Sequence, residues 1–192
     1  MDFVFFFNSI FLGVGLAMDA FSVSLANGLH EPFMKKRRMS LVAGIFAAFQ
    51  ILMPLLGWLC VSTIADIFGA FQKFIPWIAL VLLSYIGGKM LYDGIKGEEE
   101  EESSAVGLSA LLMQGVATSI DALSVGFTIA DYSAVEALLA CLLIGAVTFL
   151  ICFAGIEIGK RAGTALAGKA GIFGGAILIL IGLEIFITGI MK

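Results

Sequence analysis

Residues 13–23 read GVGLAMDAFSV, and residues 115–125 read GVATSIDALSV. Six of the eleven positions are identical, and both copies carry an aspartate inside a long apolar run. An aspartate near the middle of a bilayer costs about 2.5–3.5 kcal/mol on insertion scales, so such residues are rarely kept without a function. The repeated stretch therefore indicates both how the chain is built and where its function should be sought.

The composition indicates an integral membrane protein. The chain has 192 residues, of which 60% are hydrophobic without counting its 23 glycines, and its mean hydropathy is +1.07. Soluble domains have about 45–50% apolar residues with glycine included, so a soluble fold of this length could not bury so much apolar surface. Stretches long enough to cross a bilayer, which takes roughly 20 residues, are predicted at 3–28, 39–61, 73–93, 106–129, 134–158 and 170–190.

Further matches extend the repeat over the whole chain. Residues 86–95 (IGGKMLYDGI) and 181–190 (IGLEIFITGI) agree at four of ten positions, and Gln50 and Gly57 correspond to Thr148 and Gly155. The matches keep their order, so the chain divides into a first repeat, an acidic cytoplasmic linker and a second repeat, at 1–96, 97–105 and 106–192. Three spans per repeat is an odd number, so the second copy enters the membrane from the opposite face. The predicted fold class is an all-α membrane protein with six transmembrane helices in two inverted three-helix repeats.

The distribution of basic residues predicts the orientation of the spans. Basic residues near span ends favour the cytoplasmic side. The first, third and fifth loops hold eight of them and the opposite side only two: Lys35, Lys36, Arg37, Arg38, Lys96, Lys160, Arg161 and Lys169 against Lys73 and Lys192. We therefore expect these three loops in the cytoplasm and both termini outside.

The two aspartates are expected to meet near mid-depth, where inverted repeats usually form a binding site. Few fixed positive charges are available there, so a mobile cation is the expected partner of the two carboxylates. Other oxygen donors lie nearby in sequence or in matching spans, and the candidate ligands are Asp19, Asp121, Gln50, Ser22, Ser124, Thr118, Ser119 and Thr148. Such a set suits Mg²⁺, Ca²⁺ or Mn²⁺, whereas zinc and copper would favour His or Cys.

Several other patterns limit the classes of function. Residues 163–170 read GTALAGKA, which lacks the final hydroxyl and the preceding strand of a P-loop, so we expect no nucleotide and no nucleic-acid partner. No hydrolase motif is present, and we expect no enzyme activity and no resident cofactor. Gly155, Gly159 and Gly163 form a ridge that permits close helix packing. Gly13, Gly15 and Gly115 suit either packing or a local break in spans 1 and 4.

The residues quoted above give the chain a resemblance to a known family. GLAMDAFSVSLANG and ATSIDALSVG, with FQILMPLLGW in span 2 and LSYIGGKMLYDG in span 3, resemble the MntP-type manganese efflux pumps of bacteria. The resemblance covers essentially the whole chain and extends to a wider group of small six-span exporters of the LysE type. It implies export of Mn²⁺ across the plasma membrane, with Asp19 and Asp121 as the acids needed for transport. Some members have a carboxylate where this chain has Gln50, so this site has one charge fewer.

Two other functions remain open from the residues. The same acids could bind a small cationic metabolite such as a basic amino acid, and competition between Mn²⁺ and lysine would separate the two. A redox role for Cys60, Cys141 and Cys152 is opposed by the lack of pairing between them. Export of a divalent cation against an inside-negative potential costs about 4.6 kcal/mol per 100 mV. Because the chain has no ATPase, we expect a secondary transporter, with returning protons as the simplest energy source. The sequence gives no oligomeric state.

Overall fold

A computed structural model describes residues 3–60, 75–96, 106–165 and 170–190. All of its regular elements within these ranges are helices: α1 (Phe3–His30), α2 (Lys36–Cys60), α4 (Ile75–Lys96), α5 (Leu108–Ala117), α6 (Ile120–Thr128), α7 (Ala134–Ala165) and α8 (Ala170–Ile190). The predicted all-α class is confirmed. The acidic linker 97–105 and the lysines at 73, 169 and 192 lie outside the described residues.

Among the described residues, three helices are long and apolar enough to cross a membrane. They cover Phe5–His30, Lys36–Cys60 and Ala134–Gly163, and α5 with α6 makes a fourth candidate if the bent pair is one span. The sequence predicted a span over 106–129 and left open either packing or a local break near Gly115, and the structure has a break there. The helix stops after Ala117, resumes at Ile120, and changes direction by 40°.

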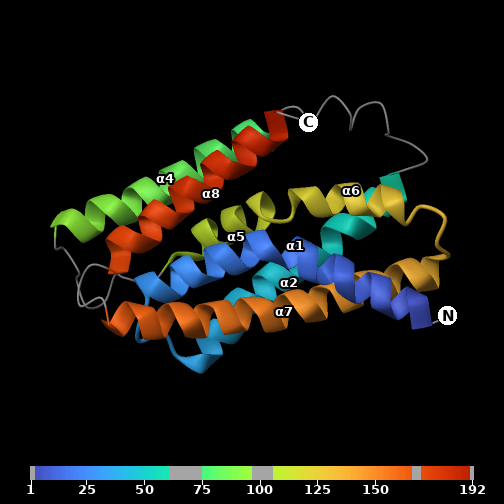
Figure 1. The fold of residues 1–192 in the computed structure, drawn as a ribbon, viewed down its shortest axis with the longest axis horizontal. Helices are drawn as coiled ribbons and strands as arrows, with labels where there is room; N and C mark the ends of the chain where they lie inside the picture. The colour runs from blue at the N-terminus through green and yellow to red at the C-terminus, as the bar shows by residue number, and fades with distance from the viewer. Residues whose placement is uncertain (1–2, 61–74, 97–105, 166–169, 191–192) are drawn as a thin grey trace.

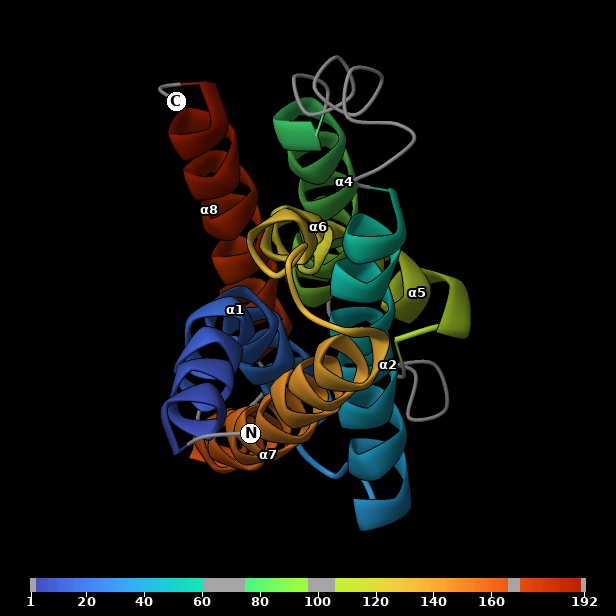
Figure 2. The ribbon, with the colours of Figure 1, turned by 90° about the vertical axis from the view of Figure 1, so that its right-hand side faces the viewer.

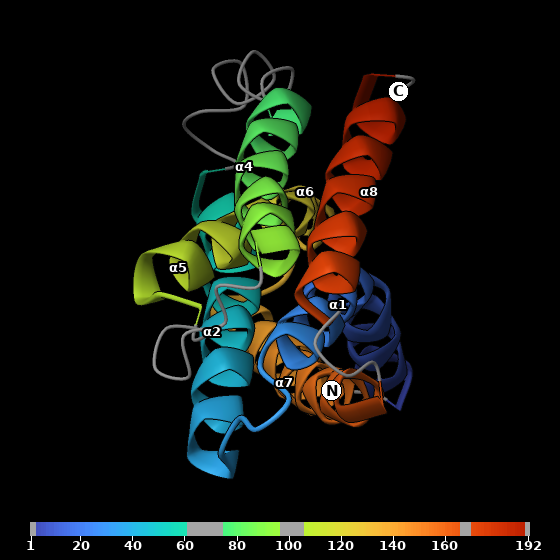
Figure 3. The ribbon, with the colours of Figure 1, turned by 90° about the vertical axis from the view of Figure 1, so that its left-hand side faces the viewer.

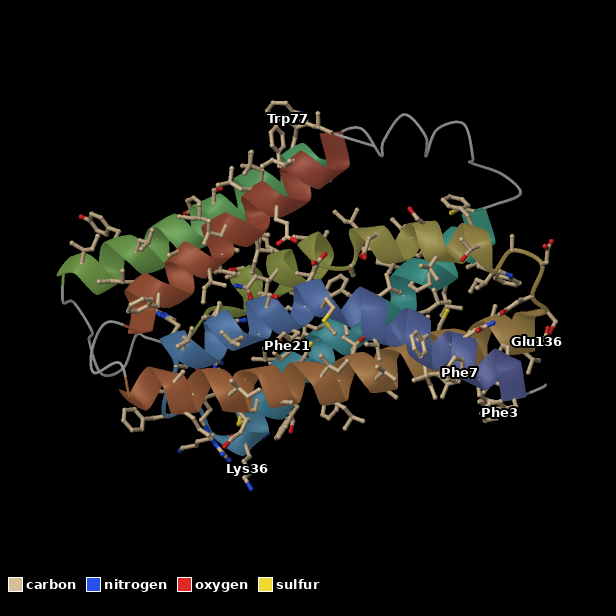
Figure 4. The ribbon with its side chains drawn as sticks, viewed as in Figure 1. Phe3, Phe7, Phe21, Lys36, Trp77 and Glu136 are labelled. Carbon is tan, nitrogen blue, oxygen red and sulfur yellow. The ribbon has the colours of Figure 1, made fainter. Side chains whose placement is uncertain are left out.

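The ends of α1, α2 and α7 lie at two opposite ends of the molecule, while the start of α4 and the end of α8 lie nearer its middle (Figure 1). The N-terminus, the end of α2 and the turn between α6 and α7 lie at one end, which we call the N-terminal end. The turn between α1 and α2 and the last residues of α4 and α7 lie at the other, which we call the basic end because it carries Lys35, Lys36, Arg37 and Arg38. Figure 4 shows Phe3 and Glu136 together at the N-terminal end.

The helices form one group and one separate pair. Helix α1 packs chiefly on α7, and α2 packs on α7 and α6. Helices α4 and α8 pack on each other and stand apart from the rest of the group in Figures 2 and 3. The α4–α8 pair contacts the group mainly where α8 touches α1, with a smaller contact between α4 and α5.

Glycines bring α1 and α7 into backbone contact. A methyl group at Gly28 would overlap the carbonyl of Ile156, one at Gly159 would overlap the carbonyl of Leu25, and one at Gly163 would lie 2.8 Å from the Leu29 oxygen. Such approach lets helices gain van der Waals contact where lipid offers no hydrophobic driving force. The predicted packing role of the glycine ridge on span 5 is confirmed.

Corresponding positions of the two halves make corresponding contacts. A methyl at Gly57 of α2 would overlap the Leu123 carbonyl of α6, while one at Gly155 of α7 would lie 3.0 Å from the Phe21 oxygen of α1. Figure 4 shows Phe21 on the part of α1 that borders α7. Gly57 and Leu123 correspond to Gly155 and Phe21 in the sequence repeat.

The same holds between α4 and α8. A methyl at Gly87 would lie 3.1 Å from the Leu178 Cβ, and a methyl at the corresponding Gly182 would lie 3.2 Å from the Cβ of Leu83. Leu83 and Leu178 correspond in the repeat at the same offset as the two glycines. The contacts between the halves are thus paired across the molecule.

Candidate functional site

The amide of Gln50 joins the two repeated stretches. Its side chain is fully buried in α2, and Nε2 donates to the carbonyl oxygens of Leu16 (3.0 Å) and Thr118 (3.2 Å). Leu16 lies three residues before Asp19, and Thr118 lies three residues before Asp121. The segments that carry the two aspartates therefore meet at one side chain.

The orientation of the Gln50 amide follows from these bonds. Two carbonyl oxygens can only accept, so the amide nitrogen must face them. The oxygen Oε1 is left buried and accepts no hydrogen bond from any described residue. A buried, unsatisfied amide oxygen costs about 1–3 kcal/mol, and a bound cation is one group that would satisfy it.

The break between α5 and α6 lies immediately before Asp121. The Thr118 hydroxyl donates to the carbonyl of Gln114 (2.9 Å), and the Ser119 hydroxyl donates to that of Gly115 (2.6 Å). The Gln114 carbonyl also accepts the Thr118 backbone N–H (3.0 Å), so the two hydroxyls add hydrogen bonds to carbonyls in the last turn of α5. Asp121 falls in the first turn of α6, where free N–H groups and the helix dipole favour a carboxylate.

The two aspartates differ in their surroundings. Asp19 is half-buried in the middle of the unbroken helix α1, and Glu184 of α8 lies close enough to act on it electrostatically. Asp121 is exposed on α6. Gly13 packs on Val147 and Gly115 packs on the ring of Phe49, so packing explains these two glycines, although Gly115 also lies near the break.

The remaining candidate ligands are placed unevenly. Ser22 is half-buried and donates to the Met18 carbonyl (3.1 Å), while Ser124 is exposed. Thr148 is fully buried on α7 and donates to the carbonyl of its own helix at Ile144 (2.9 Å). Hydroxyls that donate in this way keep lone pairs for a cation. In the described part of the chain, no group of three or more His, Cys, Asp or Glu side chains is arranged to hold a metal.

An open cavity of about 570 Å³ lies between α1 and α6 towards the N-terminal end. Its wall includes Gly15 and Leu16 of α1 and Val125 of α6. Gly15 lies one helical turn before Asp19, and Val125 one turn after Asp121. The cavity therefore reaches within a turn of both aspartates.

A buried amide pair was not predicted from the sequence. The Asn27 Nδ2 donates to Gln114 Oε1 (2.8 Å), and the Gln114 Nε2 donates to Asn27 Oδ1 (3.2 Å). Both side chains are fully buried. Polar residues inside apolar spans are a general signal of function; that signal could have marked both residues, but it could not have shown that they meet.

Comparison with known proteins finds one family and several relatives. The model of a family described as "Putative manganese efflux pump" matches residues 33–186. A Clostridium botulinum (strain Hall) protein named "Putative manganese efflux pump MntP 2" is 39% identical over 189 residues, which cover 93% of this chain and 92% of that protein. Proteins named as MntP pumps from Gloeothece citriformis and Clostridium perfringens (strain 13) are 42% and 38% identical, covering 92% and 95% of this chain and the same shares of their own lengths. No solved structure matches.

Proposed function

Because the chain belongs to the family of manganese efflux pumps, we propose that it exports Mn²⁺ from the cytoplasm as a secondary transporter, with Asp19 and Asp121 at the cation site. The observation that carries this proposal is the bridge made by Gln50. It draws together the two segments that end in these aspartates and leaves its own oxygen without a donor. A divalent cation balances two carboxylates and accepts amide, hydroxyl and carbonyl oxygens as further ligands.

The ligand set contains one carboxylate fewer than a site with an acid at position 50. The neutral Gln50 amide contributes an oxygen but no charge, so Asp19 and Asp121 together balance the two charges of Mn²⁺. Thr148 and Ser22, whose hydroxyls keep free lone pairs, are the next proposed donors. Thr118 and Ser119 act chiefly by capping the end of α5 and freeing the backbone at the break.

Six spans in two inverted repeats are the proposed architecture, with α1, α2 and α4 in the first and α5–α6, α7 and α8 in the second. The paired glycine contacts between the halves support this assignment, because an exchange of the repeats turns each contact into its partner. Inverted repeats typically place the substrate site where they meet and alternate its access between the two sides.

The proposed location is the bacterial plasma membrane, with the basic end in the cytoplasm and both chain termini outside. The basic residues 35–38, where α1 is connected to α2, support this orientation, since basic loops are retained on the cytoplasmic side. In this orientation the cavity beside Gly15 and Leu16 opens outwards. The inward flow of protons is the proposed energy source for export.

Survival of a manganese-sensitive bacterial strain in high Mn²⁺ tests the roles of the aspartates. The unmodified protein and the control Asp131→Asn, which changes an exposed aspartate in the turn before α7, should protect the cells. Asp19→Asn and Asp121→Asn should not, because each removes half of the charge that balances the ion. Equal tolerance in all four strains at equal expression would exclude the proposed site.

Proteoliposomes test the substrate and the coupling. Purified protein should move Mn²⁺ faster when a pH gradient is imposed, and excess lysine should not compete. Inhibition by lysine would favour a cationic metabolite as the substrate. A Mn²⁺ flux that ignores the pH gradient would remove proton exchange from the proposal and leave export in place.

A further inference from the structure

We propose that the buried amide pair of Asn27 and Gln114 closes the transport path at the basic end, and that these two side chains separate when the site opens to that side. The inference rests on the proposed function, because it assumes a path that passes the two aspartates and two equivalent repeats. It assigns a role in transport to two residues that contact neither aspartate in the hydrogen bonds described above.

Most residues that line the cavity have equivalents in the other repeat that are buried; the exceptions are Met113, Ala110 and His30, the equivalents of Phe11, Asn8 and Tyr132. In the repeat alignment, Leu12 corresponds to Gln114, Gly15 to Ala117, Val125 to Val23 and Ile129 to Asn27. The first member of each pair lines the cavity at the N-terminal end. The second members, Gln114, Ala117, Val23 and Asn27, are all buried. Ile129 is itself buried, so the contrast rests on Leu12, Gly15 and Val125, which are partly or fully exposed at one end of the molecule while their equivalents are buried at the other.

Asn27 and Gln114 are the polar contact within the closed surface. Asn27 lies on α1 one turn before its end, and Gln114 lies on α5 one turn before the break. Each amide donates one hydrogen bond to the other and accepts one from it. The oxygen and one N–H of each side chain are therefore satisfied. Their equivalents Ile129 and Leu12 face the open cavity and have no polar group that could form such a pair.

A second contact lies one turn nearer the basic end. Glu31 is buried and accepts hydrogen bonds from Arg38 Nε (2.7 Å) and from the backbone nitrogen of Val106 (2.6 Å). Arg38 in turn donates to the Val106 carbonyl (2.7 Å). This network ties the start of the second repeat to the first, outside the amide pair. The path at the basic end is thus closed by two layers, of which the amide pair is the inner one.

Opening at the basic end requires α5 to move away from the end of α1, which breaks both amide hydrogen bonds. Equivalence of the repeats requires the opposite end to close in the same step, with Leu12 and Ile129 approaching each other. Two interhelical hydrogen bonds in a membrane shift such an equilibrium by roughly fivefold to tenfold. A shift of this size is enough to favour one state while leaving the other accessible to the substrate.

Cysteine labelling of protein in lipid nanodiscs tests the inference without any transport assay. The three natural cysteines are replaced with alanine, and one reporter is introduced at a time: Asn8→Cys in the cavity, or Ala110→Cys at the equivalent position near the basic end. Asn27→Ala should raise the rate at which a maleimide modifies the Ala110→Cys reporter, and should lower the rate at Asn8→Cys, by at least roughly fivefold, because it removes both hydrogen bonds and leaves the buried Gln114 amide without its partner. The matched control is Leu12→Ala, which truncates the equivalent of Gln114 at the open end. This variant should not raise the labelling rate at Ala110→Cys.

A second variant keeps the amide pair intact and introduces an equivalent amide pair at the open end. The double change Leu12→Gln and Ile129→Asn should allow the same reciprocal bonds there, close the cavity and slow labelling of Asn8→Cys. Unchanged rates at both reporters, in this variant and in Asn27→Ala, would overturn the inference even if Mn²⁺ export by the unmodified protein depends on Asp19 and Asp121. Absence of Mn²⁺ export from the unmodified protein would instead remove the proposed function and leave the labelling result standing.

Discussion

Gln50 and Gln114, both fully buried in the described part of the chain, should respond differently to the same substitution. Gln50→Met removes two hydrogen bonds to carbonyl oxygens, and interhelical bonds in membranes contribute about 0.6 kcal/mol each on average. It also removes the buried Oε1 that accepts no hydrogen bond, and relief of such a group returns about 1–3 kcal/mol. Loss of the donor to the carbonyl of the buried Thr118 carries a cost of similar size, so the free energy of unfolding should change little.

Gln114→Met also removes two hydrogen bonds, but it leaves both polar atoms of the Asn27 amide buried without a partner. Adding that cost to the lost bonds predicts a destabilisation of about 2–4 kcal/mol. For a chain of this size, 1 kcal/mol corresponds to about 2–4 °C in Tm. Gln50→Met should lie within about 4 °C of the unmodified protein, and Gln114→Met should fall by roughly 5–15 °C.

Thermal unfolding of the detergent-solubilised variants, followed by circular dichroism, measures this difference, and Mn²⁺ flux in proteoliposomes measures function. Gln50→Met should reduce flux at least about tenfold, since loss of groups around a metal commonly has effects of that size. A large fall in Tm for Gln50→Met would mean that the amide serves as a structural tie. Normal flux in this variant would show that Oε1 is not a ligand of the transported ion.

Three further predictions concern packing, an ion pair and the cysteines. Gly57→Ala should cost about 1–3 kcal/mol because the added methyl overlaps the Leu123 carbonyl, while Gly15→Ala, which adds its methyl where no atom lies within 4 Å, should cost nothing; equal thermal stability of the two variants would contradict the backbone contact. Glu31→Gln should cost about 1–3 kcal/mol because Arg38 and the Val106 N–H lose a charged acceptor, and purely additive losses in a double-mutant cycle with Arg38→Gln would show that the pair is not coupled. Replacement of all three cysteines with alanine should leave Mn²⁺ flux intact, and loss of flux in a stably folded protein would revive a redox role.

Much of the helical arrangement could be predicted from the sequence, because the patterns involved are local. The predicted spans at 39–61 and 170–190 agree with α2 and α8 to within a few residues, since apolar length alone defines such helices. The spacing of Gly155, Gly159 and Gly163 likewise indicated a close helix contact without showing the partner. Its partner α1 is about 130 residues away in the chain, and only the structure identifies it.

The sequence left a break in the stretch 106–129 open without deciding it, because Thr118 and Ser119 are compatible with an intact helix. Their hydroxyls can bond to carbonyls three or four residues earlier in an intact helix as well as in a broken one. What distinguishes the two cases is a contact with another helix, because the Gln50 amide of α2 donates a hydrogen bond to the Thr118 carbonyl. The site was therefore predicted by residue type, and its geometry depends on contacts between distant segments.

The packing of α1 on α7 has a consequence for the order in which the protein assembles. Helix α1 is synthesised before its principal partner α7, with α2, α4, α5 and α6 between them, and it touches α2 only lightly. Helix α4 likewise precedes its partner α8. Independently stable helices can remain in lipid during such a delay, so the first half of the chain enters the bilayer as separate helices and acquires its tertiary structure only when the second half arrives.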